Sequence, residues 1–125
     1  MDNTDTNKKD LVTIKKEQLS GETFDKLSSF FSLFGDSTRL SIIALLSDNE
    51  LCVNDIADVL KMSQSAVSHQ LAVLRKYDIV YFYRKGKQVL YTLSDNHIKD
   101  LFLTGLEHAS EKDAEIYKDK KKKGL

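Results

Sequence analysis

Four polar side chains near the C-terminal end have the residue types of metal ligands: Asp95, His97, His108 and Glu111. Imidazole nitrogens and carboxylate oxygens are common ligands of Zn²⁺, which prefers four ligands in a tetrahedron at a distance of about 2 Å. The apolar pattern of residues 98–109 predicts that these side chains lie on or next to one long amphipathic helix.

The geometry of a helix prevents one chain from placing all four around one ion. His97 and His108 are separated by about three turns, or roughly 16 Å along the axis, at about 1.5 Å per residue. His108 and Glu111 are about one turn apart on the expected helix and can share an ion. Asp95 and His97 can share another if Asp95 occupies the helix cap.

Two copies of this helix packed antiparallel would complete two symmetric sites. The Asp95/His97 end of one chain would then lie beside the His108/Glu111 end of its partner. We therefore expect a homodimer that binds Zn²⁺, with Co²⁺ or Ni²⁺ able to take its place. Taken singly, Asp95 is better explained as an N-cap, and each histidine as polar surface. The expected packing surface is apolar: Ile98, Leu101, Phe102, Gly105, Leu106 and Ala109.

The preceding segments predict two pairs of helices. An apolar stripe from Phe24 to Phe34 ends at Gly35, and Asp36 offers an N-cap for a second helix through Leu46. A short helix from about Val53 to Leu60 and a second helix capped by Ser63 then form a helix-turn-helix pattern, connected by Lys61 and Met62. The second of these helices has Val67, Leu71 and Leu74 on its buried side and polar residues on the other. Those that we expect to contact DNA are Ser63, Gln64, Ser65, Ser68, His69 and Gln70.

Residues 81–93 change to a period of two around a glycine-containing turn at residues 84–87, which predicts a β-hairpin. Its tip carries Arg84, Lys85 and Lys87, which would contact phosphates or the minor groove. The expected fold is therefore mainly α with a β-hairpin (α+β): a winged helix-turn-helix. The order is helices, hairpin, final helix, with a symmetric dimer through the first and last helices.

The charge distribution favours nucleic-acid binding although the formal net charge is zero. Residues 61–91 carry six basic residues and one acidic residue, whereas residues 22–60 carry two basic and seven acidic ones. Residues 92–117 are also acidic. One internal segment is therefore basic, and it coincides with the expected DNA-binding elements.

The remaining composition bounds the organisation of the chain. Residues 1–20 are polar and aperiodic, which predicts a flexible arm; residues 21–117 form the domain and residues 118–125 a lysine-rich tail. The polar start is unlike a secretory signal, and no apolar run reaches the roughly 20 residues needed to span a membrane. One cysteine, Cys52, fits a reducing compartment, so we expect a cytoplasmic protein.

The stretch from Phe34 to Glu111 resembles the ArsR/SmtB family of bacterial winged-helix metal-sensing repressors. The resemblance rests on GDSTRLSIIALL, ELCVNDIA, SQSAVSHQLAVLRK and YFYRKGKQVLYTL. The last helix is similar to the zinc-sensing branch, whose motif is D-x-H, ten residues, then H-x-x-E or H-x-x-H. The four matching positions here are Asp95, His97, His108 and Glu111.

This resemblance implies a mechanism. A metal-free dimer binds operator DNA and blocks transcription, and zinc at the shared sites releases it, which derepresses genes for metal efflux or sequestration. It also implies that His108 reaches the backbone near His69. Neither catalysis nor a small-molecule substrate is implied.

One departure narrows the choice of metal. Family members that sense soft metals carry Cys-x-Cys where this chain has Cys52 and Asn54, so we expect Cys52 to be only a small buried residue. Two alternatives stay open. One is a winged-helix repressor that responds to cobalt, nickel, a redox signal or nothing. The other is a zinc hydrolase, against which four protein ligands and the lack of an acid–base constellation argue.

Overall fold

The computed structural model describes residues 8–123 of the chain, and side chains through Tyr117. The contacts divide the chain into two compact units, residues 1–31 and residues 32–125. The first seven residues and residues 124–125 lie outside the described part, so the expected arm and tail are only partly visible. The domain division expected from the sequence stays a prediction.

The first unit contains α2 (Leu11–Lys16) and most of α3 (Gly21–Phe34). The carboxylate of Asp10 caps α2 by accepting a hydrogen bond of 2.8 Å from the backbone N–H of Thr13. No periodic pattern predicted so short a helix. On α3 the apolar stripe faces outward, since Phe24 is 60% exposed and Phe31 49% exposed.

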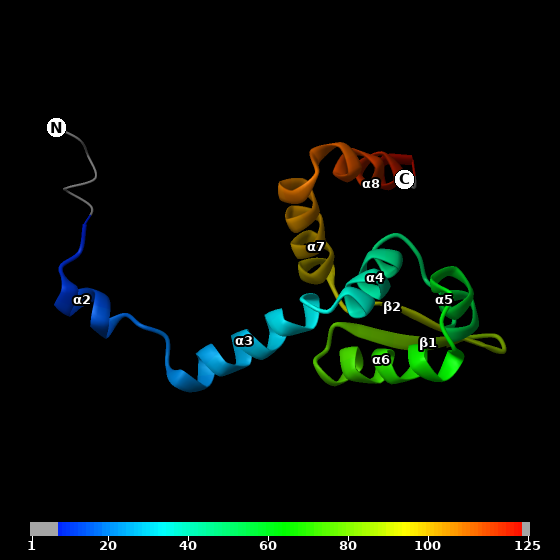
Figure 1. Ribbon diagram of the computed structural model, residues 1–125, viewed down its shortest axis with the longest axis horizontal. Helices are drawn as coiled ribbons and strands as arrows, with labels where there is room; N and C mark the ends of the chain where they lie inside the picture. The colour runs from blue at the N-terminus through cyan, green and yellow to red at the C-terminus, as the bar shows by residue number, and fades with distance from the viewer. Residues whose placement is uncertain (1–7, 124–125) are drawn as a thin grey trace. The chain divides into compact units, whose positions relative to one another are not determined.

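The second unit has a core built from three helices and a hairpin (Figure 1). These helices are α4 (Ser37–Leu46), α5 (Val53–Leu60) and α6 (Gln64–Lys76). As predicted, Asp36 caps α4 through a 2.9 Å hydrogen bond from the N–H of Arg39. Val67, Leu71 and Leu74 have no exposed surface, which confirms the predicted buried side of α6.

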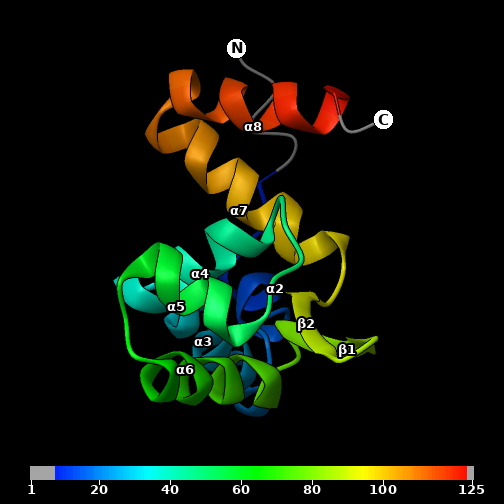
Figure 2. The same cartoon turned by 90° about the vertical axis from the view of Figure 1, so that its right-hand side faces the viewer.

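The turn between α5 and α6 is tight because each helix ends or begins on its own local signal. Lys61 terminates α5 in the left-handed region at φ 56°, and the N–H of Met62 donates to the carbonyl of Ala57. Ser63 then caps α6 through a 3.1 Å hydrogen bond from the N–H of Ala66. Figure 2 shows α5 packed beside α6. The predicted helix-turn-helix is confirmed.

The hairpin pairs β1 (Val80–Lys85) with β2 (Gln88–Leu93) in antiparallel register. Lys85 opposite Gln88 closes the ladder, so Gly86 and Lys87 form the turn, and Gly86 adopts φ 63°. Leu51 adds an isolated bridge to Tyr91 on the other side of β2. The basic wing of the predicted winged helix is therefore present.

The final helix corrects the expectation of one long helix. The helix α7 (Asn96–Ala109) ends at Ser110, which is extended at φ −161° and ψ 96°, and α8 (Glu111–Lys123) begins directly after it. Figures 1 and 2 show α8 leaving the end of α7 in a new direction. Two features hold α8 against the rest of the second unit. Ala114 is 1% exposed, and the ring of Tyr117 packs edge-on against the ring of Phe102, with 5.5 Å between the ring centroids.

No single helix among residues 8–123 is both long and apolar enough to cross a membrane. The bent pair formed by α3 and α4 meets the length and composition criteria together. Within α4, Ile42 and Ile43 have no exposed surface, because they belong to the core of the second unit.

Candidate metal and DNA sites

The recognition surface expected on α6 is exposed at its N-terminal end. Ser63, Gln64, Ser65, Ser68 and His69 all lie on the surface. Their hydroxyl, amide and imidazole groups match the groups on base edges and phosphates. The contact with DNA itself stays a prediction.

Gln70 differs from this set because it is half-buried. Its side-chain oxygen accepts a hydrogen bond of 3.5 Å from the guanidinium of Arg39 on α4. The sequence grouped Gln70 with the DNA-contacting residues, but this partner gives it a role inside the protein. Nothing in the sequence signals the pair, because its members are 31 residues apart.

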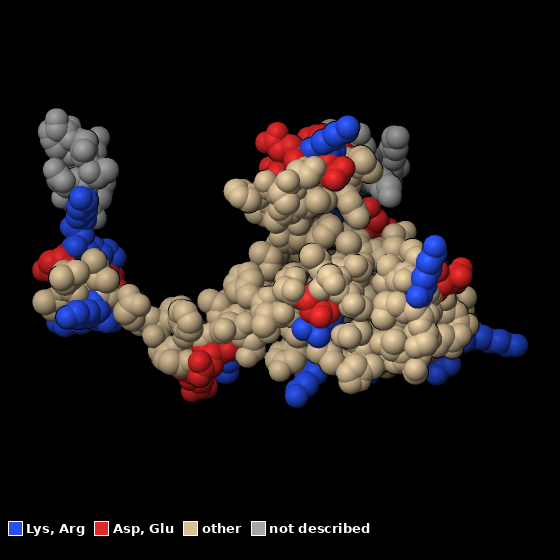
Figure 3. All heavy atoms as spheres, viewed as in Figure 1, with Lys and Arg blue, Asp and Glu red and all other residues tan. Residues whose placement is uncertain are grey.

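The wing presents a cluster of positive charge. Arg84, Lys85 and Lys87 are exposed, and basic side chains project where the β1–β2 turn lies (Figure 3). Strand β1 of the wing is held by a hydrogen bond from the hydroxyl of Tyr83 to the carboxylate of Glu50, which raises the pKa of Tyr83 above its usual value. Contacts from these basic side chains to DNA phosphates would contribute affinity rather than sequence choice.

Asp95 and His97 come together at the N-terminus of α7. One carboxylate oxygen of Asp95 accepts the capping hydrogen bond from the N–H of Ile98 at 3.2 Å. The other lies 3.4 Å from Nδ1 of His97. Cap and ligand are therefore compatible roles, because they use different oxygens. The pair faces solvent, since the His97 ring is 93% exposed and the Asp95 side chain 52% exposed.

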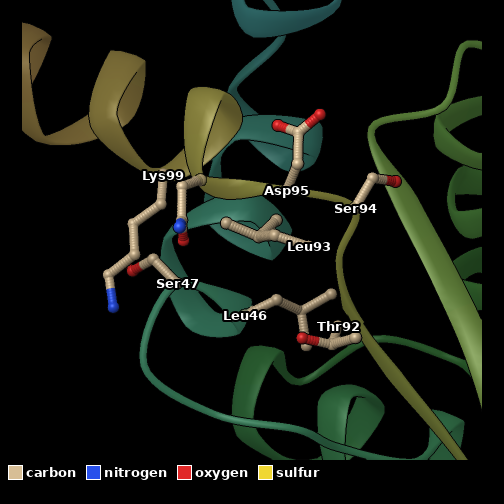
Figure 4. A pocket seen from close by; sticks show the side chains of 8 residues that line it. Leu46, Ser47, Thr92, Leu93, Ser94, Asp95 and Lys99 are labelled. Atoms are coloured by element: carbon tan, nitrogen blue, oxygen red, sulfur yellow. The ribbon is translucent and has the colours of Figure 1, made fainter.

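The electrostatics of this pair keep the carboxylate charged. The hydrogen bond from the N–H of Ile98 lowers the pKa of Asp95, as does the neighbouring His97, although partial burial opposes both. Asp95 also borders a shallow polar pocket of about 410 Å³ with Ser47 and Lys99. Figure 4 shows its carboxylate pointing away from the Lys99 ammonium. An ionised carboxylate beside an imidazole is the donor set that zinc accepts.

His108 lies near the end of α7, whereas Glu111 begins α8 on the other side of Ser110. The expected spacing of one turn on a single helix is therefore wrong for this pair. His97 and His108 do share α7, so the argument that one chain cannot place both on one ion holds. Among the described residues, no group of three or more His, Cys, Asp or Glu side chains could hold a metal. One chain thus offers an incomplete donor set.

Cys52 is half-buried at the N-cap position of α5, rather than fully buried as expected, and its thiol makes no capping hydrogen bond. It is the single cysteine of the sequence. One chain therefore offers one thiolate, with Asn54 in place of a second.

The comparisons with known proteins agree with this fold. Residues 36–81 match the family described as bacterial regulatory protein, arsR family. A transcriptional repressor SmtB homolog of Synechocystis sp. is 39% identical over 100 residues, covering 80% of this chain and 76% of the relative. The cadmium resistance transcriptional regulatory protein CadC homolog of Staphylococcus aureus is 33% identical over 103 residues, covering 82% of this chain and 85% of the relative.

Among solved structures, HlyU from Vibrio cholerae N16961 superimposes with a TM-score of 0.64 at 31% identity, over 70% of this chain and 96% of that chain. The class that fold and sequence define is a winged-helix transcriptional regulator. The chain belongs to the arsR family of bacterial regulatory proteins. Its relatives are regulators, so the alternative of a zinc hydrolase falls away.

Proposed function

We propose that this protein is a zinc-responsive transcriptional repressor that works in the cytoplasm as a homodimer. The metal-free dimer binds an operator with two half-sites, and zinc lowers its affinity for that operator. Release of the dimer derepresses genes for metal efflux or sequestration. The observation that carries the proposal is the Asp95–His97 pair at the start of α7, which supplies half of a zinc ligand set beside an apolar helix face.

The proposed sites are shared between two chains. Asp95 and His97 of one protomer bind an ion together with His108 and Glu111 of its partner. Two imidazoles and two carboxylates suit tetrahedral Zn²⁺, and Co²⁺ or Ni²⁺ can use the same donors. Bound zinc supplies a fixed link between the two protomers. Support for a dimer comes from the outward apolar stripe of α3, with Phe24 and Phe31 about half exposed.

The DNA-contacting residues proposed are those of the α6 surface and the wing. Ser63, Gln64, Ser65, Ser68 and His69 would face the major groove, with Gln70 behind them, and Arg84, Lys85 and Lys87 would contact phosphates. Zinc and operator must weaken each other's binding by the same factor. If bound zinc lowers the affinity for DNA, bound DNA lowers the affinity for zinc equally.

A zinc titration of the protein–operator complex tests this proposal. We expect fluorescence anisotropy on the promoter of the protein's own gene to show tight binding without metal. Zinc should weaken the binding by roughly 5- to 150-fold, as typical coupling energies allow. Unchanged operator affinity at saturating zinc would contradict the proposal.

Cadmium is the second candidate signal, because the chain is 33% identical to a cadmium resistance regulator over most of its length. The imidazole and carboxylate donors favour the harder zinc ion, whereas Cys52 supplies one thiolate per chain. The same titration with cadmium decides between them. A response to cadmium that survives loss of His97 but not of Cys52 would favour the second candidate.

The substitution Asp95→Asn separates the two roles of this residue. Asparagine caps helices as well as aspartate does, so the stability of the fold should change little. The lost carboxylate charge should weaken zinc binding by at least about tenfold, the lower end of the losses seen when even indirect partners of a metal are removed. Thermal unfolding and a competition assay with a zinc-binding dye measure the two effects. Unaltered zinc affinity would leave Asp95 a cap alone.

A further inference from the structure

Arg39 connects three helices: α4, on which it lies, the end of α3, and the recognition helix α6. Its backbone N–H donates to Asp36 at 2.9 Å, within α4. Its guanidinium donates through Nε to the carbonyl of Leu33 at 3.3 Å, in the last turn of α3, and through Nη1 to the side-chain oxygen of Gln70 at 3.5 Å, on α6. One planar group thus contacts α3 and α6 together.

Both partners of the guanidinium are held in place. Leu33 is 4% exposed, and its carbonyl is among the last four of α3, which have no partner within the helix. Gln70 is half-buried and precedes Leu71, which has no exposed surface. Because a guanidinium only donates, the amide of Gln70 must present its oxygen to Arg39. The guanidinium presents these donors from two separate nitrogens in a rigid fork, whereas a lysine would have to reach both acceptors from one nitrogen.

Gln70 lies on a different face of α6 from the other residues expected to contact DNA. At about 3.6 residues per turn, it is on nearly the opposite side from Ser68, two positions earlier. The bond to Gln70 therefore adds a polar tether to the buried contacts of Val67, Leu71 and Leu74, which together set the rotation of α6 about its axis and the direction in which Ser68 points.

We infer that Arg39 is a positioning residue that fixes the recognition helix α6 relative to the last turn of α3, and thereby sets the half-site spacing that the dimer reads. This inference rests on the dimeric operator binding proposed above. Half-sites of such dimers are about one helical turn of DNA apart, roughly 34–36 Å, so a dimer with fixed recognition helices tolerates little change in spacing. Loss of the Arg39 bridge removes this tether from α6 and relaxes that requirement.

The test compares operators that differ only in spacing. Full-length protein in zinc-free buffer is titrated by anisotropy onto the symmetrised promoter site of its own gene, and onto versions lengthened or shortened by one base pair. The variants are Arg39→Met, Gln70→Met and the double variant. Lys112→Met is the matched control, because it removes one positive charge from an exposed position on α8.

We expect Arg39→Met to weaken binding at the natural spacing by roughly five- to tenfold, the worth of one or two lost hydrogen bonds. Binding at the altered spacings should change little, so the preference for the natural spacing falls. Gln70→Met should act in the same direction. The double variant should be no weaker than the weaker single variant, because both remove one bridge. Lys112→Met should keep the wild-type preference.

The salt dependence separates positioning from direct contact. A positioning residue leaves the slope of log affinity against log salt unchanged, whereas a lost phosphate contact makes it shallower by about one. An unchanged spacing preference in both single variants would overturn the inference, and so would a shallower slope in Arg39→Met. If Arg39→Met does not fold by circular dichroism, Gln70→Met decides alone, since it leaves the bond from Arg39 to Leu33. Wild-type protein that binds no version of the site overturns both this inference and the proposed function.

Discussion

Replacing either histidine of α7 by alanine should abolish the zinc response while leaving operator binding intact. We expect His97→Ala and His108→Ala each to bind the operator without metal as tightly as the wild type. Zinc should then change this affinity by less than about twofold, against roughly 5- to 150-fold for the wild type. The reason is that each variant removes one ligand from both symmetric sites, and neither ring belongs to the expected DNA surface.

The control for these variants is the third histidine. His69 lies on the exposed face of α6, so His69→Ala should weaken operator binding yet keep the zinc response. Anisotropy with and without zinc measures both quantities for all three variants. A wild-type zinc response in both α7 variants would remove the proposed site, and a lost response in His69→Ala alone would move the sensor to α6.

Removing the positive charge of the wing should reduce DNA affinity in a salt-dependent way. The triple variant Arg84→Ala, Lys85→Ala, Lys87→Ala loses up to three phosphate contacts. Because each contact contributes about −0.9 to the slope of log affinity against log salt, the slope should become shallower by up to about 2.7. The affinity loss should be greatest at low salt. Anisotropy titrations between low and moderate salt measure both values.

Two features make the wing variant easy to interpret. The three side chains are exposed, so their removal leaves the core intact, and the bond from Tyr83 to Glu50 still holds strand β1. The weakening should be similar for operator and unrelated DNA, because phosphate contacts carry no sequence information. An unchanged slope would show that the wing does not contact DNA.

The sequence was sufficient for the order of the elements from α3 to α7 because each of these carries its own local signal. Asp36 and Ser63 are N-caps just before apolar periodic segments, and both cap as predicted. Gly86 in a two-residue turn fixed the register of the hairpin. The buried side of α6 followed from the spacing of Val67, Leu71 and Leu74.

Other features depend on contacts that local patterns do not record. The break between α7 and α8 at Ser110 is marked by neither proline nor glycine. A capping pattern was nevertheless present, because the N–H of Asp113 donates to the Ser110 hydroxyl at 3.4 Å. After this break α8 takes a new direction, in which its Tyr117 packs against Phe102 of α7. Likewise the bridge from Arg39 to Gln70 forms only when distant helices pack together. For a site shared between chains, one chain's pattern predicts ligand types but not the angle at which they meet.

The extended residue between α7 and α8 has a consequence for the concentration at which the sensor responds. Under the proposed ligand set, His108 and Glu111 stand on either side of Ser110. Zinc then binds only those molecules whose junction brings the two side chains together, and the apparent dissociation constant is the intrinsic one divided by that fraction. Substitutions at the junction, or in the Phe102–Tyr117 contact that holds α8, would shift the response threshold without touching a ligand. The zinc concentration at which the repressor responds then depends on the geometry of the junction between α7 and α8.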